Sequence, residues 1–291
     1  MKDFKGKVAV ITGSASGVGR SIAFRLGREG VKIVLADIEH GALEKALGEV
    51  RAAGIEAIAQ VTDVSNPDAV EALAEKSFAH FGQVHLVFNN AGVGAGGAPQ
   101  LWDTTLKAWH WGFNVNMFGV VHGIRSFTPR LIKQNLPARI INTASGAGIV
   151  FPPSTGVYAA TKAAVITLTE IMHFHLTAMN SPVKAGLLFP GPHVVDTGLF
   201  DSGRNRPKEL TDPTDAGYGI KTLEDMQKIM EMTIGRRIET THPDEVAETV
   251  YKCLLQDKYY IQVMSDKLEK GIRDRYEDMI AGRDPTPADV L

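Results

Sequence analysis

Short runs rich in β-branched and apolar residues recur along this chain, and stretches of about fifteen to fifty residues separate them. Several separating stretches carry apolar residues at helical spacing, as in SIAFRLGREG (21–30) and AVEALAEKSFAHFG (69–82). Strands that alternate with helices in this way are typical of right-handed βαβ units. The alternation therefore predicts an α/β fold, a doubly wound parallel sheet of about seven strands with helices on both faces. The predicted strands span residues 7–12, 31–36, 56–61, 84–89, 139–144, 183–189 and 258–263.

The alternation runs without a linker, low-complexity tract or repeat as far as residue 190. A chain of 291 residues with this pattern can bury a sizeable core as one unit, so we expect a single domain over 1–291. Beyond residue 190 the regularity weakens, and 200–221 is polar and rich in Gly, Pro and Asp. We expect a mobile loop segment over 192–235 and a C-terminal helical extension over 265–291. Helices are predicted at 222–234, 243–256 and 265–282.

Composition narrows the choice of partner and compartment. The net charge is −2 and charged residues make up 22%, which favours neither a nucleic-acid nor a membrane surface and leaves small molecules as the expected partners. Cys253 is the single cysteine, so the chain has no internal disulfide or cysteine metal cluster, and we expect a buried small side chain and no metal site. With no run of 18 apolar residues in the sequence, we expect a cytoplasmic protein.

A glycine-rich turn, TGSASGVG at 12–19, joins the first predicted strand to a helix. Gly13, Gly17 and Gly19 allow a tight turn and a close approach of a pyrophosphate, which the free N–H groups at the helix start attract. Asp37 ends the second strand, where a carboxylate can accept hydrogen bonds from both ribose hydroxyls of NAD and would repel the 2′-phosphate of NADP. No Lys or Arg stands at 36, at 38 or in the turn. The alternatives are an ordinary βα turn and a turn-forming Asp.

Further motifs follow in order: NNAG at 89–92, a serine at 145, YAATK at 158–162 and PG at 190–191. Together with the glycine turn they resemble the motifs of the short-chain dehydrogenase/reductase family, in its short, NAD-preferring branch. The resemblance covers roughly 5–197 and 240–263. It implies a single Rossmann-fold domain, an NAD-dependent enzyme that interconverts a secondary alcohol and a ketone, and a homodimer or homotetramer.

The resemblance also assigns roles to residues. It implies that Tyr158 is the acid/base, Lys162 its activator, Ser145 the partner of the substrate oxygen, and Asn116 the holder of a proton-relay water. Asp63 resembles the adenine contact and Thr197 the contact to the nicotinamide amide. The implied cofactor-binding residues are Gly13, Ser16, Gly17, Val18, Gly19, Asp37, Asp63, Val64, Asn90, Ala91, Gly92, Tyr158, Lys162, Pro190, Gly191 and Thr197.

The spacing of Tyr158 and Lys162 suits proton transfer. Residues four apart share one face of a helix, so the ammonium would lie beside the phenol. A phenol with its ordinary pKa near 10 is a poor base at neutral pH, and a nearby ammonium favours phenolate. We therefore expect Lys162 to lower the pKa of Tyr158, while the Ser145 hydroxyl hydrogen-bonds the same substrate oxygen.

Each assignment has a simpler alternative. Tyr158 and Lys162 could be a surface aromatic and a solvated charge, and Asn116 could cap or kink its helix. His193, in the loop after PG, could touch substrate or only solvent. Three tryptophans precede the Asn116 segment and are expected in the core or in subunit contacts rather than at the substrate: Trp102, Trp109 and Trp111.

Two other functions remain open from the sequence: a dinucleotide-binding sensor or scaffold without turnover, and a carrier-linked ketoreductase. The chain continues past the usual end of the family pattern, and the long 190–240 segment with the last helix indicates a roomy, covered, apolar substrate site. It is similar in this to bacterial members that oxidise bulky secondary, sometimes benzylic, alcohols. Helices around 104–124 and 157–177 carry many small apolar residues, and we expect them to form a subunit interface.

Overall fold

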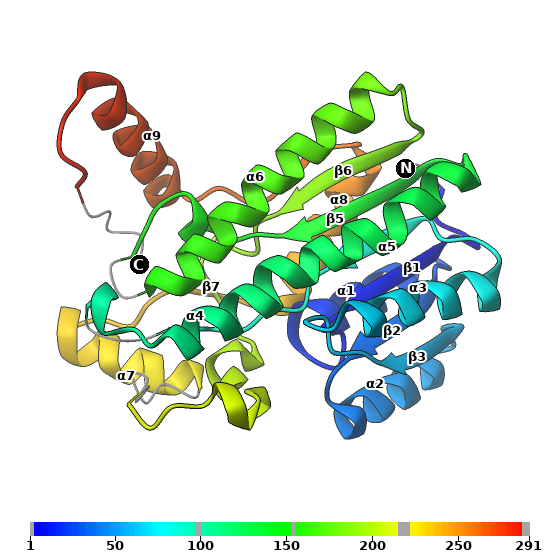
Figure 1. Cartoon of the computed structure of the whole chain (residues 1–291), viewed down its shortest axis with the longest axis horizontal. Helices are drawn as coiled ribbons and strands as arrows, with labels where there is room; N and C mark the ends of the chain where they lie inside the picture. Colours follow the sequence, from blue (N-terminus) through cyan, green and yellow to red (C-terminus); the bar gives the residue numbers. More distant parts are fainter. Residues whose placement is uncertain (1–2, 97–99, 153–154, 215–221, 287–291) are drawn as a thin grey trace.

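The computed structural model describes residues 3–96, 100–152, 155–214 and 222–286. Its centre is a sheet in the order β3-β2-β1-β4-β5-β6-β9, seven strands within these described residues, with every neighbouring pair parallel (Figure 1). The sheet confirms the predicted doubly wound fold, because the strand order reverses direction at β1. The strands are β1 (Val8–Thr12), β2 (Lys32–Asp37), β3 (Ala57–Val61), β4 (Leu86–Asn89), β5 (Ala138–Thr143), β6 (Val183–Leu188) and β9 (Tyr260–Ile261).

Helices cover both faces of the sheet, because the strand side chains alternate between two hydrophobic clusters. Ile11 and Leu35 lie in one cluster, and Val10 and Val34 lie in the other, all fully buried. The first cluster is completed by α1 (Gly17–Gly27), α2 (His40–Ala52) and α8 (Pro243–Leu255), and the second by α3 (Pro67–Phe81), α5 (Gly119–Gln134) and α6 (Gly156–Ala178). Cys253 lies in the first cluster and is 7% exposed, as predicted for a buried small side chain.

Three stretches differ from the sequence prediction. The region 104–124 is not one regular helix: α4 (Leu106–Gly112) passes through a π-helical turn, η2 (Phe113–Phe118), before α5 begins. The predicted last strand is shorter than 258–263, since β9 pairs with β6 only at two residues. A second small sheet, which the sequence did not predict, pairs β7 (Val194–Val195) with β8 (Thr240–Thr241).

The predicted loop segment 192–235 contains regular structure. After β7 the chain forms the 3₁₀ helices η5 (Gly198–Asn205) and η6 (Lys208–Leu210), and it ends in α7 (Leu223–Ile234). Residues 215–221 of this segment, and 287–291 of the predicted extension, lie outside the described residues. The extension forms α9 (Asp266–Ala281), which lies at one end of the molecule in Figure 1.

The parallel register brings several strand ends to one edge of the sheet. Thr12 pairs in register with Ala36, Asn89 with Asn142, and Thr143 with Leu188. In open α/β sheets this carboxyl edge, near the point where the strand order reverses, is where ligands bind. Among the helices of the described residues, none has the length and apolar character needed to cross a membrane.

Candidate functional site

The glycine turn after β1 has the geometry of a close backbone approach. Gly13 and Gly17 adopt φ values of 65° and 53°, which favour glycine. A Cβ atom on Gly19 would lie 2.3 Å from the carbonyl oxygen of Gly13, so no larger residue fits between the turn and the helix. Gly13 also packs closely on Ala91, whose Cα would be 2.8 Å from an added Cβ. Ser16 precedes α1 and Val18 lies in its first turn. The N–H groups at the start of the helix, which have no partner within the helix, therefore lie at this turn.

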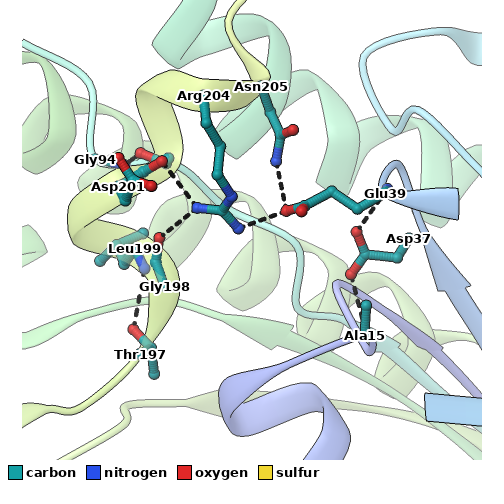
Figure 2. A network of polar contacts seen from close by, with 11 residues as sticks. Ala15, Asp37, Glu39, Gly94, Thr197, Gly198, Leu199, Asp201, Arg204 and Asn205 are labelled. Carbon is teal, nitrogen blue, oxygen red and sulfur yellow. Dashed lines mark hydrogen bonds and ion pairs between the residues drawn. The ribbon is translucent and has the colours of Figure 1, made fainter. Parts of the chain in front are cut away.

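Asp37 lies at the end of β2, beside the turn (Figure 2). Its Oδ2 accepts a hydrogen bond of 3.0 Å from the Ala15 N–H, and its Oδ1 accepts one of 3.1 Å from the Glu39 N–H. Burial raises the pKa of the Asp37 carboxyl, and these backbone hydrogen bonds oppose the rise. The carboxylate is thereby oriented, half-buried, at the place where the sequence predicted a ribose contact.

The NNAG segment is fastened to the glycine turn. Asn90 donates from Nδ2 to the Thr12 carbonyl oxygen at 3.0 Å, and its N–H donates to the Thr12 Oγ1 at 2.9 Å. After β3, the Asp63 Oδ1 accepts hydrogen bonds from the N–H and the hydroxyl of Ser65. The carbonyl oxygen of Val64 is 2.8 Å from His122 Nδ1. These contacts place Asp63, Val64, Asn90, Ala91 and Gly92 along the same carboxyl edge.

Ser145, Tyr158 and Lys162 come together where β5 ends and α6 begins. Ser145 precedes the short η3 helix (Gly146–Gly148), and its hydroxyl accepts from the Ala147 N–H and hydrogen-bonds Tyr158. Lys162 is 3% exposed, its Nζ donates to the Thr143 carbonyl oxygen at 2.8 Å, and it lies 5.6 Å from the centre of the Tyr158 ring. The predicted proximity of phenol and ammonium on one helix face is confirmed.

The pKa values of this group differ in one respect from the expectation. Burial raises the pKa of the Tyr158 phenol, and the hydrogen bond from Ser145 only partly opposes this effect. Burial also lowers the pKa of Lys162 to about 8. The expected lowering of the Tyr158 pKa is therefore wrong, because burial outweighs the opposing hydrogen bond from Ser145.

Asn116 lies in the π-helical turn and is fully buried. Its Oδ1 accepts from the Val93 N–H at 2.8 Å, and its Nδ2 donates to the Val93 carbonyl oxygen at 3.0 Å and to the Thr161 hydroxyl at 3.1 Å. The side chain therefore joins the turn, the segment after NNAG and α6. Its predicted role with a relay water stays a prediction.

The segment after β6 runs back towards the glycine turn. Pro190 and Gly191 follow β6, and the Thr197 methyl would lie 3.1 Å from a Cβ on Gly17. His193 is engaged at the edge of this segment: its Nε2 is 3.0 Å from Glu239 Oε2 and its N–H donates to Thr241 Oγ1. Thr197 is thus the residue through which this segment contacts the glycine turn.

The three tryptophans have separate environments. Trp111 is 4% exposed and packs with Val93, Ala95 and Val157, as predicted for a core residue. Trp109 stacks against Phe113, whereas Trp102 is 84% exposed and lies outside the core. A role of Trp102 in a subunit contact stays a prediction.

Sequence reasoning missed residues that reach the site from distant parts of the chain. Arg204 and Asn205 of η5 contact Glu39, two residues after Asp37 (Figure 2). Leu268 of α9 packs on Gly146, next to Ser145, so that a Cβ there would be 3.2 Å from Leu268 Cδ1. Both contacts join segments more than 100 residues apart, and no local pattern identifies such pairs.

Known proteins resemble this chain in sequence and in fold. The profile of the family described as short chain dehydrogenase matches residues 7–207. A CLA biosynthesis dehydrogenase/reductase of Lactiplantibacillus plantarum is 31% identical over 96% of this chain and 98% of its own length. A C alpha-dehydrogenase of a Sphingobium strain is 30% identical over 99% of this chain and 90% of its own length. The crystal structure of a short chain dehydrogenase/reductase from Burkholderia phymatum in complex with NAD superimposes with a TM-score of 0.87 at 40% identity, covering 98% of both chains.

Proposed function

The chain belongs to the short-chain dehydrogenase/reductase family, and from this membership we propose that it interconverts a secondary alcohol and a ketone with NAD(H) as the cofactor. It is an oxidoreductase that acts on CH–OH groups, like the dehydrogenases and reductases it matches. One observation carries the finer proposal: the hydroxyls of Ser145 and Tyr158 share a hydrogen bond beside the buried Lys162 ammonium, at the sheet edge that bears the glycine turn.

The groove fits a nicotinamide dinucleotide. A Cβ atom on Gly13 would meet Ala91, one on Gly17 would meet Thr197, and one on Gly19 would meet the Gly13 carbonyl oxygen. Glycine therefore keeps the turn tight, with its backbone N–H groups left to meet a pyrophosphate. Glycines 92 and 191, Ala91, Asn90 and Pro190 continue the groove, and Asp63 with Val64 lies towards its adenine end. When bound, the cofactor supplies the hydride acceptor or donor.

Asp37 favours NAD over NADP in this proposal. Its carboxylate is oriented to accept ribose hydroxyls and would repel a 2′-phosphate. Arg204 is a cation nearby in the structure, but its guanidinium is already paired with Glu39. The NAD complex of the matched Burkholderia phymatum protein supports the same preference.

Tyr158 is the acid/base in this proposal. Its hydroxyl gives a proton to the carbonyl oxygen during reduction and takes one from the alcohol during oxidation, while Ser145 hydrogen-bonds the same oxygen. At neutral pH Lys162, with a pKa of about 8, is mostly protonated. Its charge, 5.6 Å from the centre of the Tyr158 ring, would stabilise the phenolate against the cost of burial. Asn116 holds the helix turn in place beside Lys162, since both lie close to Gly92.

We propose a bulky apolar or aromatic substrate. Apolar side chains flank the Ser145–Tyr158 pair: Val157 directly precedes Tyr158, and Leu268 of α9 packs on Gly146, next to Ser145. Arg275 fastens α9 there by donating to the Ile149 carbonyl oxygen at 2.9 Å. A homodimer or homotetramer and a cytoplasmic location, suited to a protein with one buried cysteine, belong to the same proposal.

The test is NADH formation, followed by absorbance, with purified protein, NAD or NADP, and aliphatic, aryl and steroid secondary alcohols. We expect turnover with at least one bulky alcohol, and at least about tenfold tighter binding of NADH than of NADPH, equal to about 1.4 kcal/mol. Equal affinities would contradict the assigned role of Asp37. Tight NADH binding without turnover on any alcohol or ketone would support the sensor alternative instead.

A further inference from the structure

A short segment contacts the candidate cofactor site at three places. We name residues Thr197–Asn205, which include η5, the strap. At its start the Thr197 methyl lies against Gly17 of the glycine turn. At its middle the Ser202 hydroxyl accepts a 2.9 Å hydrogen bond from the Gly94 N–H, just beyond NNAG, and Ser202 is 5% exposed.

The end of the strap is attached to the loop after β2 (Figure 2). The Arg204 guanidinium forms an ion pair with Glu39 Oε1, and Asn205 Nδ2 donates to the same oxygen at 2.7 Å. Burial raises the pKa of the Glu39 carboxyl, but the hydrogen bonds from Arg204 and Asn205 outweigh this, so that the pKa is lowered. Both partners of the ion pair are only about one third exposed, with side-chain exposures of 36% for Arg204 and 30% for Glu39.

The guanidinium is held in place before it meets Glu39. Arg204 Nη1 also donates to the carbonyl oxygens of Gly198, at 3.0 Å, and Asp201, at 2.8 Å, within the strap itself. Less side-chain freedom is therefore lost when the ion pair forms, which distinguishes it from a pair of long, mobile surface side chains. The strap therefore presents Arg204 to Glu39 in a fixed orientation.

Glu39 also links the strap to the ribose end of the groove. Its N–H donates to Asp37 Oδ1, while the Ala15 N–H donates to Asp37 Oδ2. The strap thus begins at the turn that would hold the pyrophosphate and ends next to the carboxylate that would hold the ribose. A dinucleotide bound as in the proposed function would lie between these two attachments, and opening the Glu39 attachment would free one side of it.

We propose that Arg204, Asn205 and Glu39 form a clasp, whose contacts retain the dinucleotide and govern its rate of dissociation. These are positioning residues, since they act by closing the strap rather than by touching the reacting atoms. The inference rests on the proposed function in one respect, the binding of a nicotinamide dinucleotide in this groove. The clasp itself comes from residues that none of the motifs contains.

The test is the dissociation rate of NADH, measured by stopped-flow fluorescence after displacement with excess NAD. We expect Glu39→Gln and Arg204→Gln each to release NADH about three- to tenfold faster than the wild type, the range of one partly exposed, charge-assisted contact. The double variant should be no faster than either single variant, because both remove the same contact. Raising the salt concentration from about 50 mM to 500 mM should speed release from the wild type and leave the double variant nearly unchanged.

Arg237→Gln is the matched control, since it breaks the exposed ion pair between Arg237 and Glu224 on α7 and should leave the rate unchanged. Melting temperatures separate a loss of folding from a loss of the clasp. Wild-type release rates in both clasp variants, or multiplied effects in the double variant, would overturn the clasp while leaving the proposed function intact. Failure of the wild type to bind NADH would overturn both.

Discussion

Lys162 is buried and Tyr158 is half-buried, and the pKa values of both side chains are displaced towards their neutral forms. The pKa of Lys162 falls to about 8 and that of Tyr158 rises, in each case because burial disfavours charge. The raised pKa of Tyr158 therefore favours its phenol form at neutral pH. The sequence predicted that the two groups meet, since four-residue spacing on a helix is local, but it could not predict the degree of burial, which depends on the whole fold.

His85 is a second buried titratable residue, outside the candidate site. It is 1% exposed, and its Nδ1 accepts a hydrogen bond of 3.1 Å from the Val8 N–H, which joins β1 to the start of β4. Burial, with a smaller contribution from the charge of Lys7, lowers the pKa of His85 to about 4. Between about pH 4 and its ordinary value of 6.5, the unfolded chain thus binds a proton at this residue that the folded protein does not.

We predict that His85 makes the protein sensitive to acid. Stability falls as the pH drops below 6.5 and continues to fall towards 4, by about 2–3 kcal/mol at pH 4.5 from this residue alone. In His85→Asn the amide oxygen can still accept from Val8, but the titration is removed. Urea unfolding at pH 7.5 and 4.5 should show a smaller loss of stability in the variant, by about 2 kcal/mol. Equal losses in both proteins would refute the assignment.

At the scale of elements, α5 packs closely on a row of hydrogen-bonded, buried amide side chains in the sheet. Asn89 Nδ2 donates to Asn142 Oδ1 at 2.8 Å, and Asn142 Nδ2 donates to Thr169 Oγ1 at 3.0 Å, which links β4, β5 and α6. Gly123 of α5 lies directly on this chain, since an added Cβ would be 2.0 Å from Asn89 Oδ1. Because the amides are satisfied and buried, they have little freedom to move.

We predict that Gly123→Ala lowers the free energy of unfolding by about 1–3 kcal/mol, the usual cost of overpacking. Gly48→Ala is the matched control, a helical glycine of α2 with nothing within 4 Å of its added Cβ. That substitution should be neutral or stabilise by up to about 1 kcal/mol through helix propensity. Denaturant unfolding of the two variants measures the contrast, and a similar effect in both would show that α5 does not pack this closely.

The sequence predicted the main elements well, and its misses have physical causes. Buried parallel strands read as apolar runs, so the six strands β1 to β6 were found with small errors at their ends. The π-helical turn around Asn116 follows from its bonds to Val93 and Thr161, and the pairing of β7 with β8 joins residues 194–195 to 240–241. Both depend on contacts between distant segments, which periodicity does not report. The strap was missed for the same reason.

At the scale of the whole molecule, one sheet draws strands from residue 8 to residue 261, in keeping with the single domain that stays a prediction. The outer face of α6 exposes apolar side chains at helical spacing: Ile171 is 44% and Phe174 63% exposed. Phe118, at the junction of η2 and α5, is 44% exposed. These residues belong to the two helical regions expected to form a subunit interface.

We predict that the protein is a dimer or tetramer at micromolar concentration, and that Phe174→Glu shifts it towards a monomer. A buried carboxylate without a partner would cost more than the interface could tolerate. Met279→Glu on α9 is the control, because Met279 is equally exposed at 63% and lies outside α5 and α6. Light scattering coupled to gel filtration gives the mass. A wild-type monomer would contradict the prediction, as would dissociation by the control alone.

The central claim is that Tyr158 moves the proton while NAD(H) moves the hydride. The direct measurement compares the wild type with Tyr158→Phe, and with Tyr276→Phe on the exposed side of α9 as the control, in steady-state turnover and in NADH titration. We predict that Tyr158→Phe loses about 100- to 10,000-fold in turnover and still binds NADH, because only the proton path is removed. A Tyr158→Phe variant that keeps more than about a tenth of wild-type turnover would contradict the account, since general acid–base catalysis of this size cannot then reside in Tyr158.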